Sequence, residues 1–106
     1  MSHAYHVVWT ETARKDLVTI IEHISLDSLE RAQQLYLKLV TLAESLSQYP
    51  ERGRVIPELR CQGISSYREL IFPPWRLMYR VEDRRVVVLA VLDGRRNPED
   101  ILLDRF

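Results

Sequence analysis

The sequence predicts an α+β domain in which an antiparallel pair of helices packs on one face of a single, mostly antiparallel β-sheet. Apolar residues recur at helical spacing in residues 11–48, and strand-like patterns follow in residues 67–92. Helices followed by a run of strands are typical of this class. Within Trp75–Glu82 every second side chain is apolar, which predicts a core face of Trp75, Leu77, Tyr79 and Val81 and an opposite face of Arg76, Met78, Arg80 and Glu82.

An unbroken apolar run, Val86–Leu92, predicts the central strand of the sheet. A strand of this composition is either buried on both faces or keeps one face for a partner, and the sequence leaves both alternatives open.

Length and charge limit the functions that this chain can have. The 106 residues suit one domain, residues 1–106, and the net charge of zero argues against bulk electrostatic binding to nucleic acid. Residues 1–51 carry 4 basic and 7 acidic side chains, whereas residues 52–106 carry 11 arginines and 8 acids. A lone Cys61 excludes an internal disulfide, and no signal peptide or membrane span is expected. We therefore expect a cytoplasmic protein.

The first half of the chain predicts one strand and two helices. Tyr5–Trp9 is rich in β-branched and aromatic residues, as strands are. Thr10 or Thr12 is expected to cap the first helix. Its apolar stripe consists of Ala13, Leu17, Ile20, Ile21 and Ile24.

The second helix is expected to begin at a cap formed by Asp27 or Ser28 and to run to about Gln48, because Pro50 ends it. The short break between the helices predicts an antiparallel hairpin. The wide apolar stripe of this helix predicts packing on both its partner helix and the sheet; it includes Ala32, Leu35, Leu39, Leu42 and Leu46.

The second half predicts a loop and three strands. Glu51–Gly63 has no clean period and is expected to be a loop. Pro73-Pro74 forms the turn between Tyr67–Phe72 and the strand that begins at Trp75, and Asp93-Gly94 ends the last strand. A short C-terminal helix is expected to start at Asn97, with proline at its first position.

Several kinds of chemistry are not expected. His3, His6 and His23 lack the partner ligands of a metal site, and Cys61 reads as an incidental thiol. No glycine-rich stretch is present that would cradle phosphates. We expect neither a metal nor a cofactor.

The arginines are the remaining candidates for function. Arg76 and Arg80 share a strand face with Met78, and Arg95 and Arg96 follow the end of the adjacent strand. Arg68 joins them if the pairing register permits. Such a set suits either RNA phosphates or the carboxylates of a protein partner. Cleavage of RNA also requires a proton acceptor and donor, and the C-terminal tail DGRRNPEDILLDRF contains neither His nor Tyr.

Five segments in order along the chain resemble the RelE/ParE toxin superfamily: WTETARKDLVTIIEHI, LSQYPERGR, YRELI, WRLMYRV and VVVLAVLDGRR. The resemblance implies a bacterial toxin from a two-gene toxin–antitoxin module. It further implies a cognate antitoxin that binds and neutralises the toxin in a hetero-oligomer.

The superfamily has two main activities, and the resemblance implies residues for each. Arg68, Arg76 and Arg96 match positions where the ribonuclease branch has functional basic residues. Leu70, Leu102 and Asp93 stand where that branch has a lysine, a catalytic tyrosine and a histidine. The sequence therefore favours a ParE-like inhibitor of DNA gyrase rather than an enzyme, with target or antitoxin contacts expected from Arg76, Met78, Arg80, Arg95 and Arg96. A ribosome-dependent mRNA endonuclease of the RelE type, and a degenerate toxin that only binds its antitoxin, are the alternatives.

Overall fold

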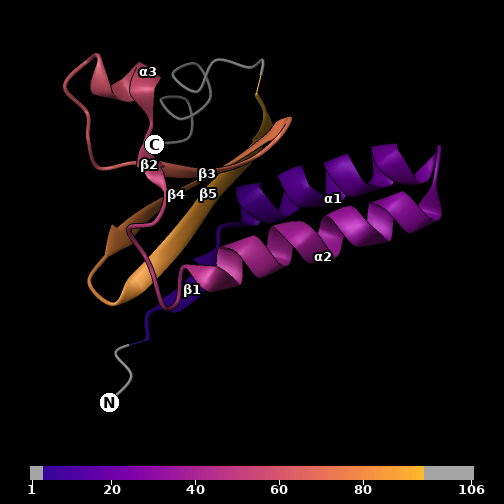
Figure 1. Ribbon diagram of the computed structural model, residues 1–106, viewed down its shortest axis with the longest axis horizontal. Coiled ribbons are helices and arrows are strands. Elements are labelled where there is room, and N and C mark those ends of the chain that lie inside the picture. The colour runs from indigo at the N-terminus through magenta and orange to yellow at the C-terminus, as the bar shows by residue number, and fades with distance from the viewer. Residues whose placement is uncertain (1–3, 95–106) are drawn as a thin grey trace.

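Three helices and five strands follow one another along residues 4–94, the part of the chain that this computed structural model describes (Figure 1). The expected helix from Asn97 lies outside these residues. In chain order the elements are β1 (His6–Trp9), α1 (Glu11–Ser25), α2 (Leu29–Ser45), β2 (Arg54–Val55), α3 (Pro57–Arg60), β3 (Arg68–Phe72), β4 (Trp75–Glu82) and β5 (Arg85–Asp93).

The five strands form one sheet in the order β1-β5-β4-β3-β2. β1 pairs with β5 in parallel, and the other three pairs are antiparallel. The predicted α+β class and the mostly antiparallel sheet are thus confirmed. The expectation that Val86–Leu92 forms the central strand was wrong, because β5 is second in the order, between β1 and β4, and β4 lies at the centre.

The two long helices form the expected antiparallel hairpin over one face of the sheet (Figure 1). Thr10, not Thr12, caps α1, because its side chain accepts a hydrogen bond of 3.1 Å from the backbone N–H of Ala13. Ser28, not Asp27, caps α2. The α-helix ends at Ser45, three residues before the predicted end.

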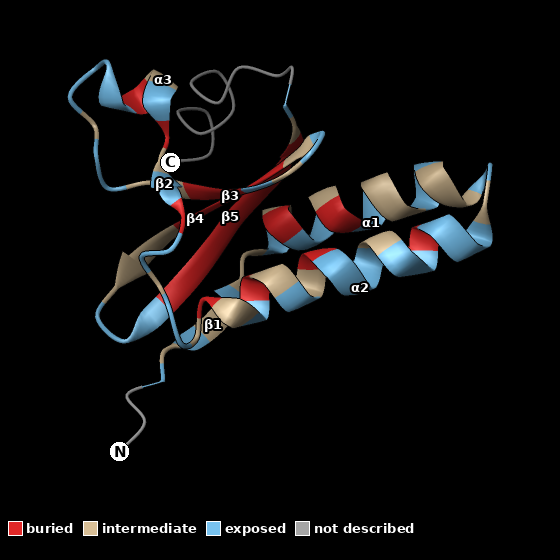
Figure 2. Ribbon diagram, viewed as in Figure 1, coloured by how far each residue is buried: buried red, intermediate tan, exposed pale blue. Residues whose placement is uncertain are grey.

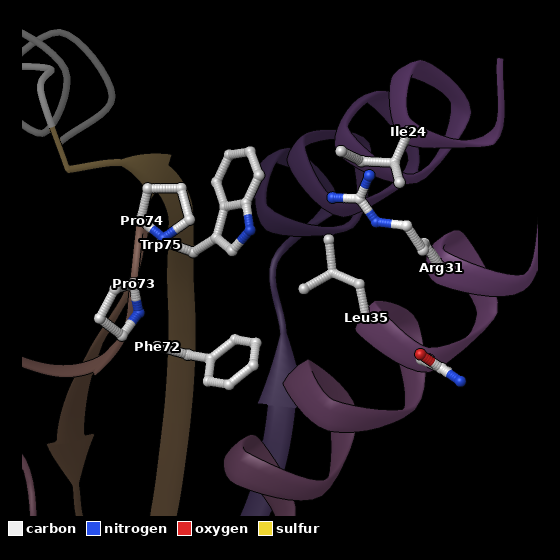
Figure 3. A pocket seen from close by; sticks show the side chains of 8 residues that line it. Ile24, Arg31, Leu35, Phe72, Pro73, Pro74 and Trp75 are labelled. Atoms are coloured by element: carbon white, nitrogen blue, oxygen red, sulfur yellow. The ribbon is translucent and has the colours of Figure 1, made fainter. Parts of the chain in front are cut away.

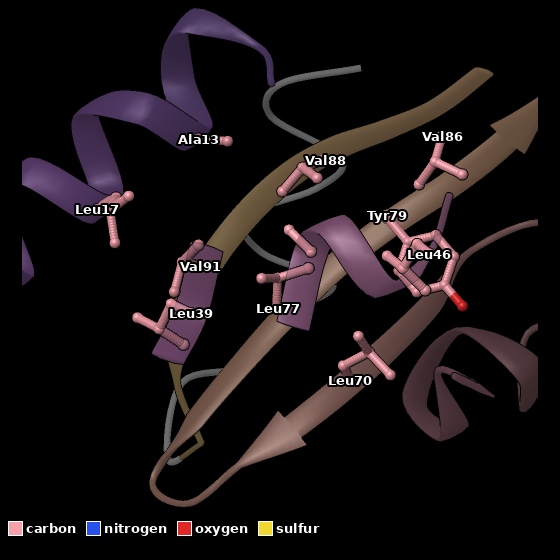
Figure 4. Close-up of a cluster of buried hydrophobic side chains, with 11 residues drawn as sticks. Ala13, Leu17, Leu39, Leu46, Leu70, Leu77, Tyr79, Val86, Val88 and Val91 are labelled. Atoms are coloured by element: carbon pink, nitrogen blue, oxygen red, sulfur yellow. The ribbon is translucent and has the colours of Figure 1, made fainter. Parts of the chain in front are cut away.

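The main hydrophobic core lies between the hairpin and the sheet (Figure 4). The predicted core face of β4 is confirmed, since Leu77 and Tyr79 are buried there and Trp75 and Val81 pack against the same cluster. The helices contribute side chains that include Ala13, Leu17, Leu39, Ala43 and Leu46.

The opposite face of the sheet is covered by a segment that the sequence predicted to be a loop. Glu51–Gly63 contains β2 and α3, and Ile56 and Leu59 from this segment are almost fully buried. The prediction was wrong because a two-residue strand and a four-residue helix are too short to show a period. Pro57 lies in the first turn of α3, a position that favours a helix start.

Because this segment covers the second face of the sheet, it decides whether Val86–Leu92 is buried on both faces or keeps one face for a partner. Val86–Leu92 is buried on both faces within the chain, and β5 is buried along almost its whole length in Figure 2. The second face of the strand packs with Met78, Ile56 and Leu59.

Leu89 is an extra residue in β5. Met78 lies opposite Ala90, whereas the next residue, Tyr79, lies opposite Val88, so Leu89 has no partner in β4. Such a β-bulge lets two successive side chains point to the same face. Leu89 and Ala90 accordingly both belong to the cluster under α3.

Candidate functional site

Four charged side chains meet between β2, β3, β4 and α3. We call Arg54, Glu58, Glu69 and Arg76 the ion-pair cluster. Glu69 and Arg76 are diagonal neighbours, because Arg76 lies opposite Ile71 in the β3–β4 pairing. Arg54 lies directly opposite Glu69 in the β2–β3 pairing. Glu58 approaches from α3.

Arg76 is the centre of this cluster. Its Nε donates to Glu69 Oε1 at 2.6 Å and its Nη2 to Glu69 Oε2 at 2.9 Å. The same guanidinium binds both oxygens of Glu58 at 2.8 Å. Four of the five N–H donors that an arginine carries are therefore shared between two carboxylates.

The centre of the cluster is buried, whereas its two outer side chains, Glu58 and Arg54, are 38% and 58% exposed. The Arg76 side chain is 7% exposed and that of Glu69 is 0% exposed, and Arg54 Nε binds Glu69 Oε2 at 2.8 Å. The hydrogen bonds from Arg76 lower the pKa of Glu58 from 4.5 to about 2, although partial burial opposes this shift. Hydrogen bonds to Glu58 and Glu69 likewise raise the pKa of Arg76. Two positive and two negative charges thus balance one another.

Arg80 lies on the same face of β4 as Arg76, as predicted, but in different surroundings. Met78 between them is fully buried under α3. The Arg80 Nε lies 3.1 Å from Glu82 Oε2, and Arg85 binds the other Glu82 oxygen at 2.8 Å. This second set is partly exposed, so Arg80 is more accessible to a macromolecule than Arg76.

Arg68 does not join the face of Arg76. It lies opposite Tyr79, and paired residues point to the same side of a sheet, so Arg68 lies on the side of the helix hairpin. Its Nη1 donates to the backbone oxygen of Gly53 at 2.8 Å and is 3.4 Å from that of Glu51. The register thus separates two of the three arginines expected for a ribonuclease. Arg95 and the third, Arg96, lie outside the described residues.

Tyr79 fixes the segment that leads into β2. Its hydroxyl donates to the Pro50 backbone oxygen at 2.8 Å and accepts from the Gly53 N–H at 3.0 Å. Burial raises the pKa of this hydroxyl. A Cβ at Gly53 would lie 2.6 Å from both the Tyr79 hydroxyl and the Glu69 backbone oxygen, so a glycine is needed here.

Sequence reasoning missed the two acids of the cluster. The turn at Pro73-Pro74 makes β3 and β4 a hairpin, and counting outward from it would have placed Glu69 on the face of Arg76. Glu58 gave no such signal, because its approach depends on how α3 packs.

Other sites are not found in residues 4–94. That range holds no group of three His, Cys, Asp or Glu side chains placed to bind a metal. Cys61 is a free, exposed thiol. None of the described helices is long and apolar enough to cross a membrane.

Comparison with known protein families identifies the family of this chain. A family model described as "ParE toxin of type II toxin-antitoxin system, parDE" matches residues 7–98, which is most of the chain. The chain belongs to the ParE toxin family. It is therefore the toxin of a type II toxin–antitoxin system.

Two proteins of Caulobacter vibrioides are similar to this ParE-family toxin. Toxin RelE2 is 37% identical over 91 residues, which are 85% of this chain and 96% of RelE2. Toxin ParE3 is 33% identical over 60 residues, 57% of this chain and 56% of ParE3. The relatives therefore carry the names of both branches of the superfamily.

Solved structures share the fold. A chain of the chromosomal ParDE system from P. aeruginosa superposes with a TM-score of 0.71 at 24% identity, covering 87% of this chain and 98% of that one. A chain of the RelBE2 toxin–antitoxin complex from Mycobacterium tuberculosis gives a TM-score of 0.63 at 26% identity, covering 85% and 91%. The recognition of the RelE/ParE superfamily from sequence motifs is confirmed.

Proposed function

We propose that this toxin inhibits DNA gyrase and does not cleave RNA, and that a cognate antitoxin neutralises it in a hetero-oligomer. The observation that carries the proposal is the engagement of Arg76 by Glu58 and Glu69. The ParDE and RelBE2 structures, both toxin–antitoxin systems, support the antitoxin partner.

Ribonuclease chemistry would need free donors around a phosphate. Cleavage by the 2′-hydroxyl requires cations to stabilise the charge of the transition state and groups to move protons. Arg76 has one N–H outside its bonds to carboxylates, and a phosphate beside it would meet the negative charges of Glu58 and Glu69. The Tyr79 hydroxyl is also unsuited, because both of its hydrogen bonds hold backbone groups.

Inhibition of a protein target needs no such constellation. A binding surface requires shape, apolar contacts and matched charges, and a neutralised cluster with a buried centre helps to hold that surface rigid. The ion-pair cluster fits this role, since it ties α3 to three strands.

The test is a gyrase assay with purified toxin, plasmid DNA and ATP. We expect cleaved, gyrase-bound DNA to accumulate as the toxin concentration rises, and to disappear when the toxin is first saturated with its antitoxin. Normal supercoiling at excess toxin would contradict the proposal.

A ribosome-dependent mRNA cleavage assay belongs beside it, because toxin RelE2 of Caulobacter vibrioides matches most of this chain. We expect intact mRNA. Cut mRNA with normal supercoiling would establish the RelE-type activity instead. If the protein is folded and binds its antitoxin but has no effect in either assay, it is a degenerate toxin that only binds its antitoxin.

A further inference from the structure

The loop between α2 and β2 is held in place by strands that lie far from it in the sequence. We call residues 49–53 the tyrosine loop. The Tyr79 hydroxyl from β4 binds the backbone of Pro50 and Gly53. From β3, Arg68 Nη1 donates to the Gly53 oxygen at 2.8 Å. Because these bonds hold the loop backbone at several points, its exposed side chains project from a rigid base.

The tyrosine loop borders a hollow of about 610 Å³. Tyr49 lines this hollow and is 69% exposed. Tyr5 lines it as well, and the Tyr5 N–H donates to the Ser47 oxygen at 2.9 Å, so the loop lies beside the start of β1 (Figure 1). Two tyrosines from separate segments of the chain therefore meet at one hollow. The rest of its lining comes from Gln48, Pro50, Glu51 and Arg52.

Arg52 is the cation that lines this hollow. Its Nη1 donates to the Ser45 hydroxyl at 2.8 Å, and it forms no ion pair within residues 4–94. Arg54 and Arg76, in contrast, are bound to carboxylates of the chain itself. The guanidinium of Arg52 thus remains available to a carboxylate of another molecule.

We infer that the tyrosine loop is a contact surface for gyrase, on which a gyrase segment places an apolar side chain against Tyr49 and a carboxylate on Arg52. The inference rests on the proposed function and names the surface through which the toxin reaches its target. Tyrosine and arginine are among the residue types that most often carry the energy of protein interfaces. Because the loop backbone is already fixed, binding orders little further chain and less free energy is lost. A folded enzyme can dock on such a loop without a rearrangement of either partner.

A protein segment fits this surface better than a nucleic acid. A nucleic acid carries a phosphate at every nucleotide, so a strand along the loop would meet the carboxylate of Glu51 as well as Arg52. A protein can place a single carboxylate at Arg52 and keep the rest of its surface apolar. The zero net charge of the chain also provides no long-range attraction to DNA.

The test compares single variants of the toxin in the gyrase assay with plasmid DNA and ATP. Tyr49→Ala should raise the toxin concentration that gives half of the maximal gyrase-bound DNA by about tenfold or more, as the loss of a central interface residue does. Arg52→Gln removes the charge and keeps most of the side chain, and should raise that concentration about threefold to tenfold. The affinity of both variants for the antitoxin, measured by calorimetric titration, should stay unchanged.

Two matched controls make similar changes elsewhere on the surface. Tyr36→Ala removes an exposed tyrosine of α2. Arg31→Gln removes a cation of α2 that extends into a different hollow, between the helix hairpin and the turn that joins β3 to β4 (Figure 3). Both controls should leave the effect on gyrase unchanged. All four substituted residues are exposed, so the variants are expected to fold and to give the circular dichroism spectrum of the natural toxin.

Four results would overturn the inference. An unchanged gyrase effect of Tyr49→Ala, or an equal loss in Tyr36→Ala, would exclude the loop as a specific contact. An equal loss of antitoxin affinity in Tyr49→Ala would assign the loop to the antitoxin, and a gel shift of plasmid DNA without gyrase that Tyr49→Ala abolishes would assign it to DNA. Failure of the proposed function is read from the natural toxin, because normal supercoiling at excess toxin sinks both proposals. If the natural toxin and Tyr49→Ala trap gyrase on DNA equally well, only the tyrosine loop is excluded.

Discussion

The guanidinium of Arg76 and the carboxylate of Glu69 lie side by side in the interior of the toxin, joined by hydrogen bonds of 2.6 and 2.9 Å. Neither side chain is more than 7% exposed. Two adjacent strands thus share a buried charge pair at a place where the sequence alone suggested a surface for phosphates or for the carboxylates of a protein partner.

Replacement of Arg76 tests how strongly this pair is coupled. Arg76→Met leaves the Glu69 carboxylate buried with Arg54 as its remaining cation, and we expect a loss of about 3–5 kcal/mol in the free energy of unfolding. Urea denaturation monitored by circular dichroism measures it. Arg80→Met is the matched control on the same face of β4, and should cost less than about 1 kcal/mol because its ion pair is partly exposed.

A double variant makes this prediction sharper. When Glu69→Gln is added to Arg76→Met, the combined loss should be clearly smaller than the sum of the two single losses, since no buried charge is left without its partner. Additive losses would show that the two side chains contribute independently.

Removal of the Tyr79 hydroxyl should loosen the entry to β2. Tyr79→Phe leaves the Gly53 N–H without its acceptor and the Pro50 oxygen without its donor, and we expect a loss of about 1–3 kcal/mol. Tyr36→Phe, at an exposed position of α2, should change stability little. Equal stabilities of the two variants would argue against the role of the hydroxyl.

The Glu58–Arg76 ion pair should make the free energy of unfolding depend on pH in the acid range. The pKa of Glu58 is lower in the folded toxin, about 2, than its ordinary value of 4.5, so its stabilising effect is full above pH 4.5 and is lost as the pH falls toward 2. The difference in unfolding free energy between the natural toxin and Glu58→Gln should therefore shrink over this range. A constant difference from neutral pH to pH 2 would contradict it.

The cap of α2 offers a prediction that separates two neighbouring residues. Ser28→Ala removes the side chain that accepts from the Arg31 N–H at 3.2 Å and should cost about 1 kcal/mol. Asp27→Ala should cost less, because Asp27 precedes the cap. Thermal unfolding of the two variants, compared at the same pH, provides the measurement.

Much of the fold could be predicted because periodicity is a local property. The stripe of α2 and the alternation of Trp75–Glu82 each extend over enough residues to identify the element and its buried face. The choices of Thr10 over Thr12 and Ser28 over Asp27 needed the structure, since neighbouring residues have nearly equal capping propensity.

The site was harder to predict because it depends on tertiary contacts. Whether Arg68 lies beside Arg76 depends on the strand register, and the extra residue Leu89 depends on how β5 meets β4. The partner Glu58 lies 18 positions from Arg76 in a helix too short to be visible as a pattern. A cluster of arginines in a sequence therefore does not reveal which of them are already neutralised.

The parallel pairing of β1 with β5 has a consequence for how the toxin acquires its structure. Each of the four paired positions of β1 meets a residue about 80 positions later in the chain, so this contact carries one of the largest loop-closure costs in the described fold. The helix hairpin is local and is available early, whereas both hydrophobic cores require β5. During synthesis the sheet cannot be completed until β5 has left the ribosome, and a chain that stops before Arg85 lacks the strand that joins β1 to β4.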